Sequence, residues 1–214
     1  IWITTQRYLV AFPSLDLERE LLEKHDVVIG IDEVGRGALA GPVASGAFFL
    51  TAELLEGMPK DLRDSKLVPE PKRASLAHEV ANWGEARVGL SPAEFIDQRG
   101  IMAALKTAVV QTLEEIKYSN PVILLDGSHN FLADVDIEVV MKTKADRDCG
   151  SVAAAAISAK VARDSLMVEL AKIYPGYGFE ENKGYASQKH IEAIQSIGPS
   201  PEHRKSWLTK ILAD

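Results

Sequence analysis

Residues 27–43 of this 214-residue chain read VVIGIDEVGRGALAGPV. The first five, residues 27–31, are apolar and mostly β-branched, which predicts a strand buried on both faces of a sheet. Two carboxylates, Asp32 and Glu33, follow this run without a spacer. A bare charge at the end of a buried strand costs too much free energy unless it is paired, bound to a metal or protonated. The stretch therefore indicates a sheet that presents acidic groups at one edge.

The same pattern recurs twice. Residues 122–125 are apolar and end on Asp126, and Asp146 follows a predicted strand over residues 137–144. Ligands bind at the strand ends of α/β sheets, and hard cations such as Mg²⁺ prefer oxygen ligands. Two such ions, about 4 Å apart, can activate a water at a phosphodiester. The alternative is that each aspartate forms a turn or caps a helix.

Strands and helices alternate along the rest of the chain, which predicts an α/β fold with helices on both sides of the sheet. Besides the strands above, we expect a strand over residues 42–50, a loop over 58–71, a helix start at Ser91, and helices over 15–24, 72–82, 102–117, 153–174 and 189–198.

The composition, 46% apolar and 26% charged, is that of a globular protein and excludes general disorder. The net charge of −7 argues against an anionic partner. However, residues 142–214 hold 11 Lys and Arg against 9 Asp and Glu, so the negative excess lies earlier in the chain. The late cations are candidate phosphate contacts, or else a solvated surface. They include Lys142, Lys144, Lys160, Arg163, Lys183 and Lys189.

The sequence indicates a cytoplasmic protein that does not enter a membrane. Its one cysteine, Cys149, excludes an internal disulfide and a cysteine-based zinc site. Its five histidines are scattered, no apolar run approaches the roughly 20 residues that cross a bilayer, and residues 1–12 do not form a signal peptide.

Two further segments carry residue types that suit nucleic acid. Gly35-Arg36-Gly37 allows the backbone to turn sharply and approach a ligand, and Arg36 can grip a phosphate. Its alternative is a tight connection between two strands. Residues 176–179 and 182–185 set aromatics among glycines and bases, which suits stacking on a sugar or base. For Tyr177 and Phe179 we prefer ordinary packing against the core.

The run from Asp32 to Val43 resembles the signature of type 2 ribonucleases H (ribonuclease HII). The resemblance spans residues 28–207 and continues in chain order. Its later blocks are residues 64–66 (DSK), 125–127 (LDG), 144–146 (KAD), 151–155 (SVAAA), 159–164 (AKVARD), 182–185 (NKGY) and 203–204 (HR). Ala38 and Ala145 depart from the residues common in that family, and Asp148 adds a carboxylate near Asp146, but no catalytic group is lost.

The resemblance implies an RNase H-like fold: a central mixed β-sheet flanked by helices, with helical C-terminal elements. It implies cleavage of the RNA strand of RNA–DNA hybrids and incision 5′ of single ribonucleotides in duplex DNA, leaving a 3′-hydroxyl and a 5′-phosphate. The catalytic metal ligands would be Asp32, Glu33, Asp126 and Asp146, which would hold two Mg²⁺ or Mn²⁺ ions. With the basic candidates added, the substrate-binding set is Gly35, Arg36, Gly37, Lys66, Lys144, Lys160, Arg163, Lys183 and Tyr185.

We expect residues 1–214 to form one catalytic domain and to act as a monomer on RNA–DNA hybrids and on DNA that contains ribonucleotides. Residues 1–26 would be an extension with a short helix, and residues 176–214 a substrate-contacting helical segment. Type 3 ribonuclease H is the nearest rival, but about 25 residues before the first strand are too few for its N-terminal domain. A second alternative, another metal-dependent nuclease of this fold, would leave the Gly-Arg-Gly block and Tyr185 without a function. A non-catalytic binding module predicts a lost carboxylate.

Overall fold

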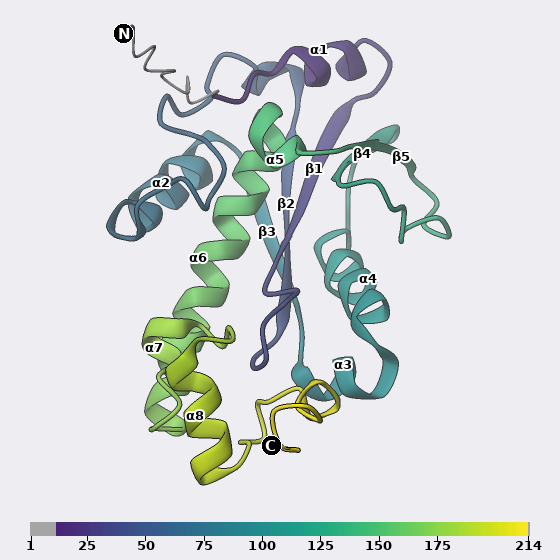
Figure 1. Cartoon of the computed structure of the whole chain (residues 1–214). Helices are drawn as coiled ribbons and strands as arrows, with labels where there is room; N and C mark the ends of the chain where they lie inside the picture. The colour runs from purple at the N-terminus through teal and green to yellow at the C-terminus, as the bar shows by residue number, and fades with distance from the viewer. Residues whose placement is uncertain (1–11, 214) are drawn as a thin grey trace, which may run out of the picture.

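Residues 12–213, which the structure (a computed structural model) describes, contain five strands in one mixed sheet. The strand order is β3-β2-β1-β4-β5, and Figure 1 shows helices on both faces of the sheet. β1 pairs antiparallel with β2 and parallel with β4, while β3 and β5 form the antiparallel and parallel edges. The bounds are β1 Val27–Val34, β2 Val43–Leu50, β3 Glu85–Ser91, β4 Pro121–Asp126 and β5 Glu138–Lys142. The expected mixed sheet with flanking helices is confirmed.

The central strand is longer than its apolar run. β1 continues to Val34 because its last residues pair with β2, with Asp32 opposite Gly46 and Val34 opposite Ala44. The prediction that the strand ends at residue 31 is therefore wrong. Asp32 and Glu33 belong to the sheet itself, so their positions are fixed by strand pairing.

Two helices cover opposite faces of the sheet because side chains alternate along β2. Phe48 lies in a core cluster with α6 (Gly150–Ile173), whereas Phe49 lies in a cluster with Val109 of α4 (Ile101–Thr112). The approach of α6 is close: a Cβ built on Gly46 would lie 2.1 Å from the carbonyl oxygen of Ala155. Glycine is therefore required where α6 crosses β2.

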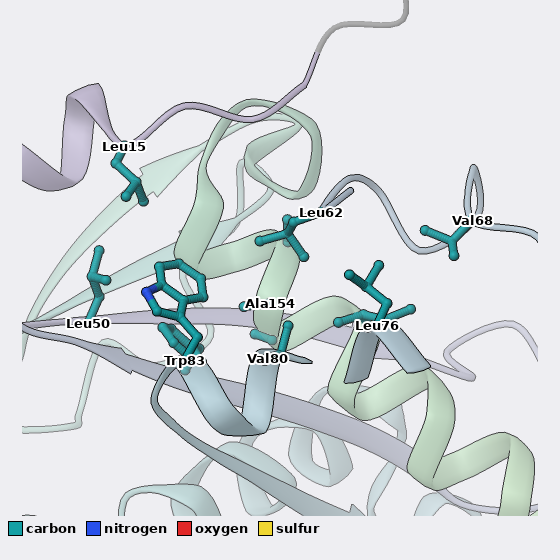
Figure 2. Packing of buried hydrophobic residues seen from close by; sticks show 12 residues of the cluster. Leu15, Leu50, Leu62, Val68, Leu76, Val80, Trp83 and Ala154 are labelled. Atoms are coloured by element: carbon teal, nitrogen blue, oxygen red, sulfur yellow. The ribbon is translucent and has the colours of Figure 1, made fainter. Parts of the chain in front are cut away.

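A third helix, α2 (Glu70–Trp83), completes the core on the α6 face. Figure 2 shows Trp83 pointing toward Leu15 and Leu50, and its indole stacks on Phe48 with ring centroids 4.4 Å apart. The indole N–H donates to the carbonyl of Leu54 at 2.7 Å, so the polar end of the ring is also satisfied. The helix starts at Glu70, two residues earlier than predicted.

The remaining helices are short. They are α1 (Asp16–Leu22), α3 (Ala93–Arg99), α5 (Ala145–Asp148), α7 (Phe179–Asn182), α8 (Gln188–Ile197) and the 3₁₀ turns η1 (Ala52–Leu54) and η2 (Lys205–Trp207). The predicted bounds of the longer helices are right within three residues, except that the helix predicted over 102–117 ends at Thr112, before the left-handed Glu115 (φ of 54°). Strand β3 was not predicted, because only Gly89 and Ser91 of this edge strand are buried and no apolar alternation results.

The C-terminal elements pack around the far end of α6. Met167 and Leu170 of α6 form a cluster with Tyr177, Phe179 and Ile194, which fixes α7 and α8 beside the helix. No helix of residues 12–213 has the length and apolarity to cross a membrane. The expectations for residues 1–11 lie outside the described part of the chain.

Candidate active site at the carboxyl ends of β1 and β4

Strand pairing brings the first carboxylates together. β1 and β4 are parallel with Ile31 opposite Leu125, so Asp32 and Asp126 occupy the next position on neighbouring strands. Glu33 follows on β1, and its negative charge raises the pKa of the neighbouring Asp32 carboxyl, in addition to the effect of burial. Asp32 is 8% exposed. This is the edge where an α/β sheet binds its ligands.

Asp126 also positions the fourth carboxylate. Its Oδ1 accepts a hydrogen bond from the backbone N–H of Ala145 at 2.7 Å, which fixes the start of α5. Lys144 before it adopts a left-handed conformation with φ of 63°, and the chain turns there from β5 toward β4. Asp146 lies in the first turn of α5 and is buried. The structure thus gathers Asp32, Asp126 and Asp146 from three separate segments.

Burial and mutual repulsion both raise the pKa values of two of these carboxyl groups, Asp32 and Asp146. Burial, together with the negative charges of Glu33, Asp126 and Asp146, raises the pKa of Asp32 well above its usual range. Burial and the charges of Asp64 and Asp126 likewise raise the pKa of Asp146. A cation placed among these carboxylates would relieve both effects.

A fifth carboxylate and a lysine come from the loop before α2. Asp64 is buried, and its Oδ1 accepts the N–H of Lys66 at 2.9 Å. The Lys66 Nζ lies 3.6 Å from Oδ2 of Asp146. Burial would lower the pKa of Lys66, but the charges of Asp64, Asp146 and Asp32 raise it. The sequence reasoning chose Lys66 and missed Asp64, although both lie in the DSK block.

The donor set fits a hard divalent cation. It consists of carboxylate oxygens alone, which is the preference of Mg²⁺ and Mn²⁺. In residues 12–213 no three Asp, Glu, His or Cys side chains stand in the geometry of a finished ion site. The raised pKa of Asp32 nevertheless marks the place where positive charge is lacking. Asp32, Glu33, Asp126 and Asp146 are the residues that would hold such an ion.

The Gly-Arg-Gly loop begins two residues after Glu33. Gly35 has φ of +82°, and a Cβ there would lie 2.1 Å from Nε of Arg163, so glycine is required. Its N–H donates to the hydroxyl oxygen of Tyr185 at 3.1 Å. Arg36 is exposed, and its Nη1 lies 3.3 Å from Oε1 of Glu33. The structure therefore joins the loop to the acidic cluster on one side and to Tyr185 on the other.

Tyr185 is 36% exposed and lies beside two cationic side chains. The guanidinium carbon of Arg163 and the Nζ of Lys160 lie 5.4 and 5.8 Å from the ring centroid. Both distances are within the range of cation–π attraction, which holds the ring in place. The exposed part of the ring is available to a sugar or base.

Several basic candidates do not face solvent, and the structure corrects their expected role. Arg163 is fully buried and donates to the carbonyls of Pro42, Lys183 and Ala40, so it cannot contact a phosphate directly. Lys183 is buried with its Nζ on the carbonyl of Glu180 and 3.2 Å from Glu70. Lys160 pairs with Asp164 at 2.8 Å. Of the late cations proposed as phosphate contacts, Lys144 and Lys189 are exposed, and Lys189 lies 3.8 Å from Glu181.

Sequence reasoning missed one more residue at this site. Arg204 is fully buried and donates to the carbonyls of Gly35 and Arg36, although it is far from both in the sequence. Burial and the nearby charge of Arg163 lower its pKa to about 9, so its guanidinium stays charged at neutral pH. Its only sequence signal was its place in the HR block.

Comparison with known proteins agrees with this geometry. The profile of the family "Ribonuclease HII" matches residues 29–210. Ribonuclease HII of Aliarcobacter butzleri is 38% identical over 186 residues, which cover 86% of this chain and 92% of that protein. The crystal structure of ribonuclease H2 from Pyrococcus horikoshii superposes with a TM-score of 0.71 at 25% identity, covering 87% of this chain and 97% of that one.

A more distant solved structure shares the fold. Bst-RNase HIII, determined in complex with Mn²⁺, superposes with a TM-score of 0.57 at 20% identity. The match covers 83% of this chain and 65% of that one. The sheet, the acidic strand ends and the family match together show an RNase H-like fold. The chain belongs to the ribonuclease HII family, and it is a ribonuclease H, an endonuclease that acts on RNA–DNA hybrids.

Proposed function

We propose that this ribonuclease H also incises duplex DNA on the 5′ side of a single embedded ribonucleotide, leaving a 3′-hydroxyl and a 5′-phosphate, with two Mg²⁺ or Mn²⁺ ions. The observation that carries this proposal is the hydrogen bond between the Gly35 N–H and the Tyr185 hydroxyl, two residues from Glu33. It places a backbone turn and an aromatic ring beside the acidic cluster. A site that reads one ribose needs such groups next to the reacting phosphate.

The carboxylates supply the ion-binding half of the proposal. Asp32, Glu33, Asp126 and Asp146 are proposed as the ligands, and the buried, charge-crowded position of Asp32 supports this role. When bound, two divalent ions activate a water for in-line attack and stabilise the leaving oxygen. Lys66, 3.6 Å from Asp146, is placed to contact a phosphate oxygen once ions occupy the cluster.

The loop and Tyr185 supply the recognition half. The 2′-hydroxyl is the group that distinguishes RNA from DNA at a given site. The exposed Arg36 is free to leave Glu33 and donate to the neighbouring phosphate, since a guanidinium matches phosphate geometry. The exposed face of the Tyr185 ring is proposed to pack on the sugar at the RNA–DNA junction. Of the exposed late cations that the sequence suggested, Lys144, two residues before Asp146, is the one proposed to lie near the duplex.

The organisation of the chain follows from the same placement. We propose one catalytic domain in which residues 176–214 contact the substrate, because Tyr185 from that segment meets Gly35 from the sheet. All the proposed catalytic and recognition groups come from one chain, which supports a monomer. The single, buried Cys149 is compatible with a reducing cytoplasm. Size-exclusion chromatography with light scattering tests the monomer.

The decisive experiment compares three duplexes: DNA with one ribonucleotide, an RNA–DNA hybrid, and DNA alone. Each is incubated without divalent ions, with Mg²⁺ and with Mn²⁺, and product ends are assigned by phosphatase and ligase treatment. We expect cleavage of the first two only with ions, and a 5′-phosphate on the downstream fragment. Cleavage on the 3′ side of the ribonucleotide, or none of the first duplex, would refute the proposal.

Two variants make a matched pair for the carboxylate assignment. Asp126→Asn should lower kcat/KM on the single-ribonucleotide duplex at least about 100-fold, a loss of roughly 2.7 kcal/mol in transition-state stabilisation. Asp148→Asn removes an exposed carboxylate of α5 that lies 3.3 Å from the ammonium of Lys142. It should leave the rate near that of wild type. Near-normal activity of Asp126→Asn would refute its role.

A further inference from the structure

The buried side chain of Arg204 donates hydrogen bonds to the backbone of the Gly-Arg-Gly loop. Its Nη1 donates to the carbonyl of Arg36 at 2.8 Å, and its Nη2 to the carbonyl of Gly35 at 2.7 Å. Nε and Nη2 both donate to the carbonyl of Gly41, at 3.2 and 3.1 Å. Gly35 and Gly41 are the two left-handed glycines that bound the loop, with φ of 82° and 78°. One rigid guanidinium therefore fixes both ends of the segment from Gly35 to Gly41 and the backbone of Arg36 at its start.

His203, the residue before Arg204, is linked through His190 to Tyr185, the aromatic residue of the proposed recognition site. The backbone N–H of Ser200 donates to His203 Nδ1 at 2.9 Å, so the His203 proton is on Nε2. That Nε2 donates to Nε2 of His190 at 3.0 Å. His190 must then carry its proton on Nδ1, which donates to the carbonyl of Tyr185 at 2.8 Å. Both rings are buried and neutral.

The main chain of this segment is anchored beside the loop as well. The N–H of Arg204 donates to the carbonyl of Leu39 at 2.9 Å, and the N–H of Gly41 donates to the carbonyl of Glu202 at 2.8 Å. Four hydrogen bonds link Arg204 to Gly35, Gly35 to Tyr185, Tyr185 to His190 and His190 to His203, and the peptide bond between His203 and Arg204 closes this path into a ring. The loop and Tyr185 cannot shift separately without breaking it.

We propose that His203 and Arg204 are positioning residues for ribose recognition: they fix the Gly35–Gly37 backbone and the Tyr185 ring relative to each other, and so set the preference for a ribonucleotide over a deoxyribonucleotide. Neither touches the substrate, because both are buried. This inference rests on the proposed recognition role of the loop and Tyr185. Its competitor is a purely structural role, in which the two residues only stabilise the C-terminal elements.

The test measures binding in metal-free buffer, where no cleavage occurs. The quantity is the ratio of Kd for all-DNA duplex to Kd for the same duplex with one ribonucleotide. Arg204→Lys keeps the positive charge but loses the fork that reaches three carbonyls. We expect the ratio to fall at least about tenfold toward one, a change of about 1.4 kcal/mol. Ile194→Ala, a buried residue of the C-terminal cluster that takes part in none of these hydrogen bonds, is the stability control, and its ratio should equal that of wild type.

A double-mutant cycle separates positioning from stability. Tyr185→Phe removes the hydroxyl that accepts from Gly35. If the ring of hydrogen bonds acts as a unit, Tyr185→Phe lowers the ratio in the wild-type background but changes it little in Arg204→Lys. Additive effects of the two changes would overturn the proposal.

His203→Phe gives an independent reading if Arg204→Lys fails to fold by circular dichroism. This variant keeps an aromatic ring against Tyr177 but removes the hydrogen bond to His190. It should lower the ratio of the two Kd values severalfold. If either folded variant keeps the wild-type ratio of Kd values while its melting temperature falls as in Ile194→Ala, the inference is overturned and the proposed function is not affected. A wild-type ratio of one would instead refute the proposed recognition function itself.

Discussion

The ammonium of Lys66 lies 3.6 Å from the Oδ2 of Asp146, at the edge of a carboxylate cluster drawn from β1, β4 and α5. Lys66 lies on the loop before α2, far from Asp146 in the sequence. It is the cation that pairs with Asp146 among the described ion pairs. The cluster is thus partly neutralised by the chain itself. A divalent ion entering it would take over the role of this lysine.

Lys66→Gln should therefore make stability more dependent on divalent ions. Without ions the cluster loses its cation, and we expect a melting temperature lower by at most about 4 °C, the scale of one exposed pair. With saturating Mg²⁺ the difference should shrink, because the ions supply the missing charge. Calorimetry with EDTA and with Mg²⁺ measures it. An equal difference in both buffers would contradict this view of the cluster.

The two roles of Asp126 are separable by substitution. In Asp126→Asn the side-chain oxygen can still accept from Ala145, so we expect near-normal stability with little activity. Asp126→Ala loses this bond as well and should be less stable by about 0.5–2 kcal/mol, the scale of a helix cap. Urea unfolding of both variants checks this. Equal stability of the two would show that the Ala145 bond does not hold α5.

The two glycines that flank Arg36 should differ sharply in tolerance. Gly35→Ala forces a side chain into a left-handed conformation and against Arg163, and should destabilise by about 1–3 kcal/mol. Gly37→Ala is the matched control, since a Cβ there meets nothing within 4 Å and its φ is not left-handed. We expect Gly37→Ala to change stability little. Equal losses in denaturant titrations would contradict the backbone argument.

The His190–His203 pair predicts a loss of stability in mild acid. Burial and the neighbouring His190 lower the pKa of His203 to about 4, from 6.5. The unfolded chain therefore binds a proton that the native chain does not, and stability falls as pH drops from about 6.5 toward 4. The full loss for this group is about 3 kcal/mol.

His203→Phe isolates the contribution of His203. The raised pKa values of buried Asp32 and Glu18 increase stability as pH falls, but they do so equally in wild type and variant and cancel in the difference. The stability difference between wild type and His203→Phe should shrink as pH falls from 7.5 to 4.5 in urea titrations. A difference that is constant across this range would show that the pair does not titrate as described.

Much of the fold could be predicted because its signals are local. The apolar runs at residues 27–31 and 122–125 mark the two central strands, and the amphipathic pattern over residues 102–117 marks α4, which ends earlier, at Thr112. Strand β3 could not be predicted, because an edge strand with few buried positions lacks alternation. The end of β1 depended on its pairing with β2.

The sequence by itself determined the chemistry of this protein: acidic residues placed directly after apolar strand segments, and a glycine-bounded arginine three residues after Glu33. Those features follow from the order of residues, so periodicity and residue type reveal them. Only the tertiary structure decided which side chains serve the site. Asp64 joined the cluster, Arg163 and Lys183 proved buried, and Arg204 met Gly35 across 169 positions. Such contacts depend on how distant elements pack, and no local pattern in the chain records that packing.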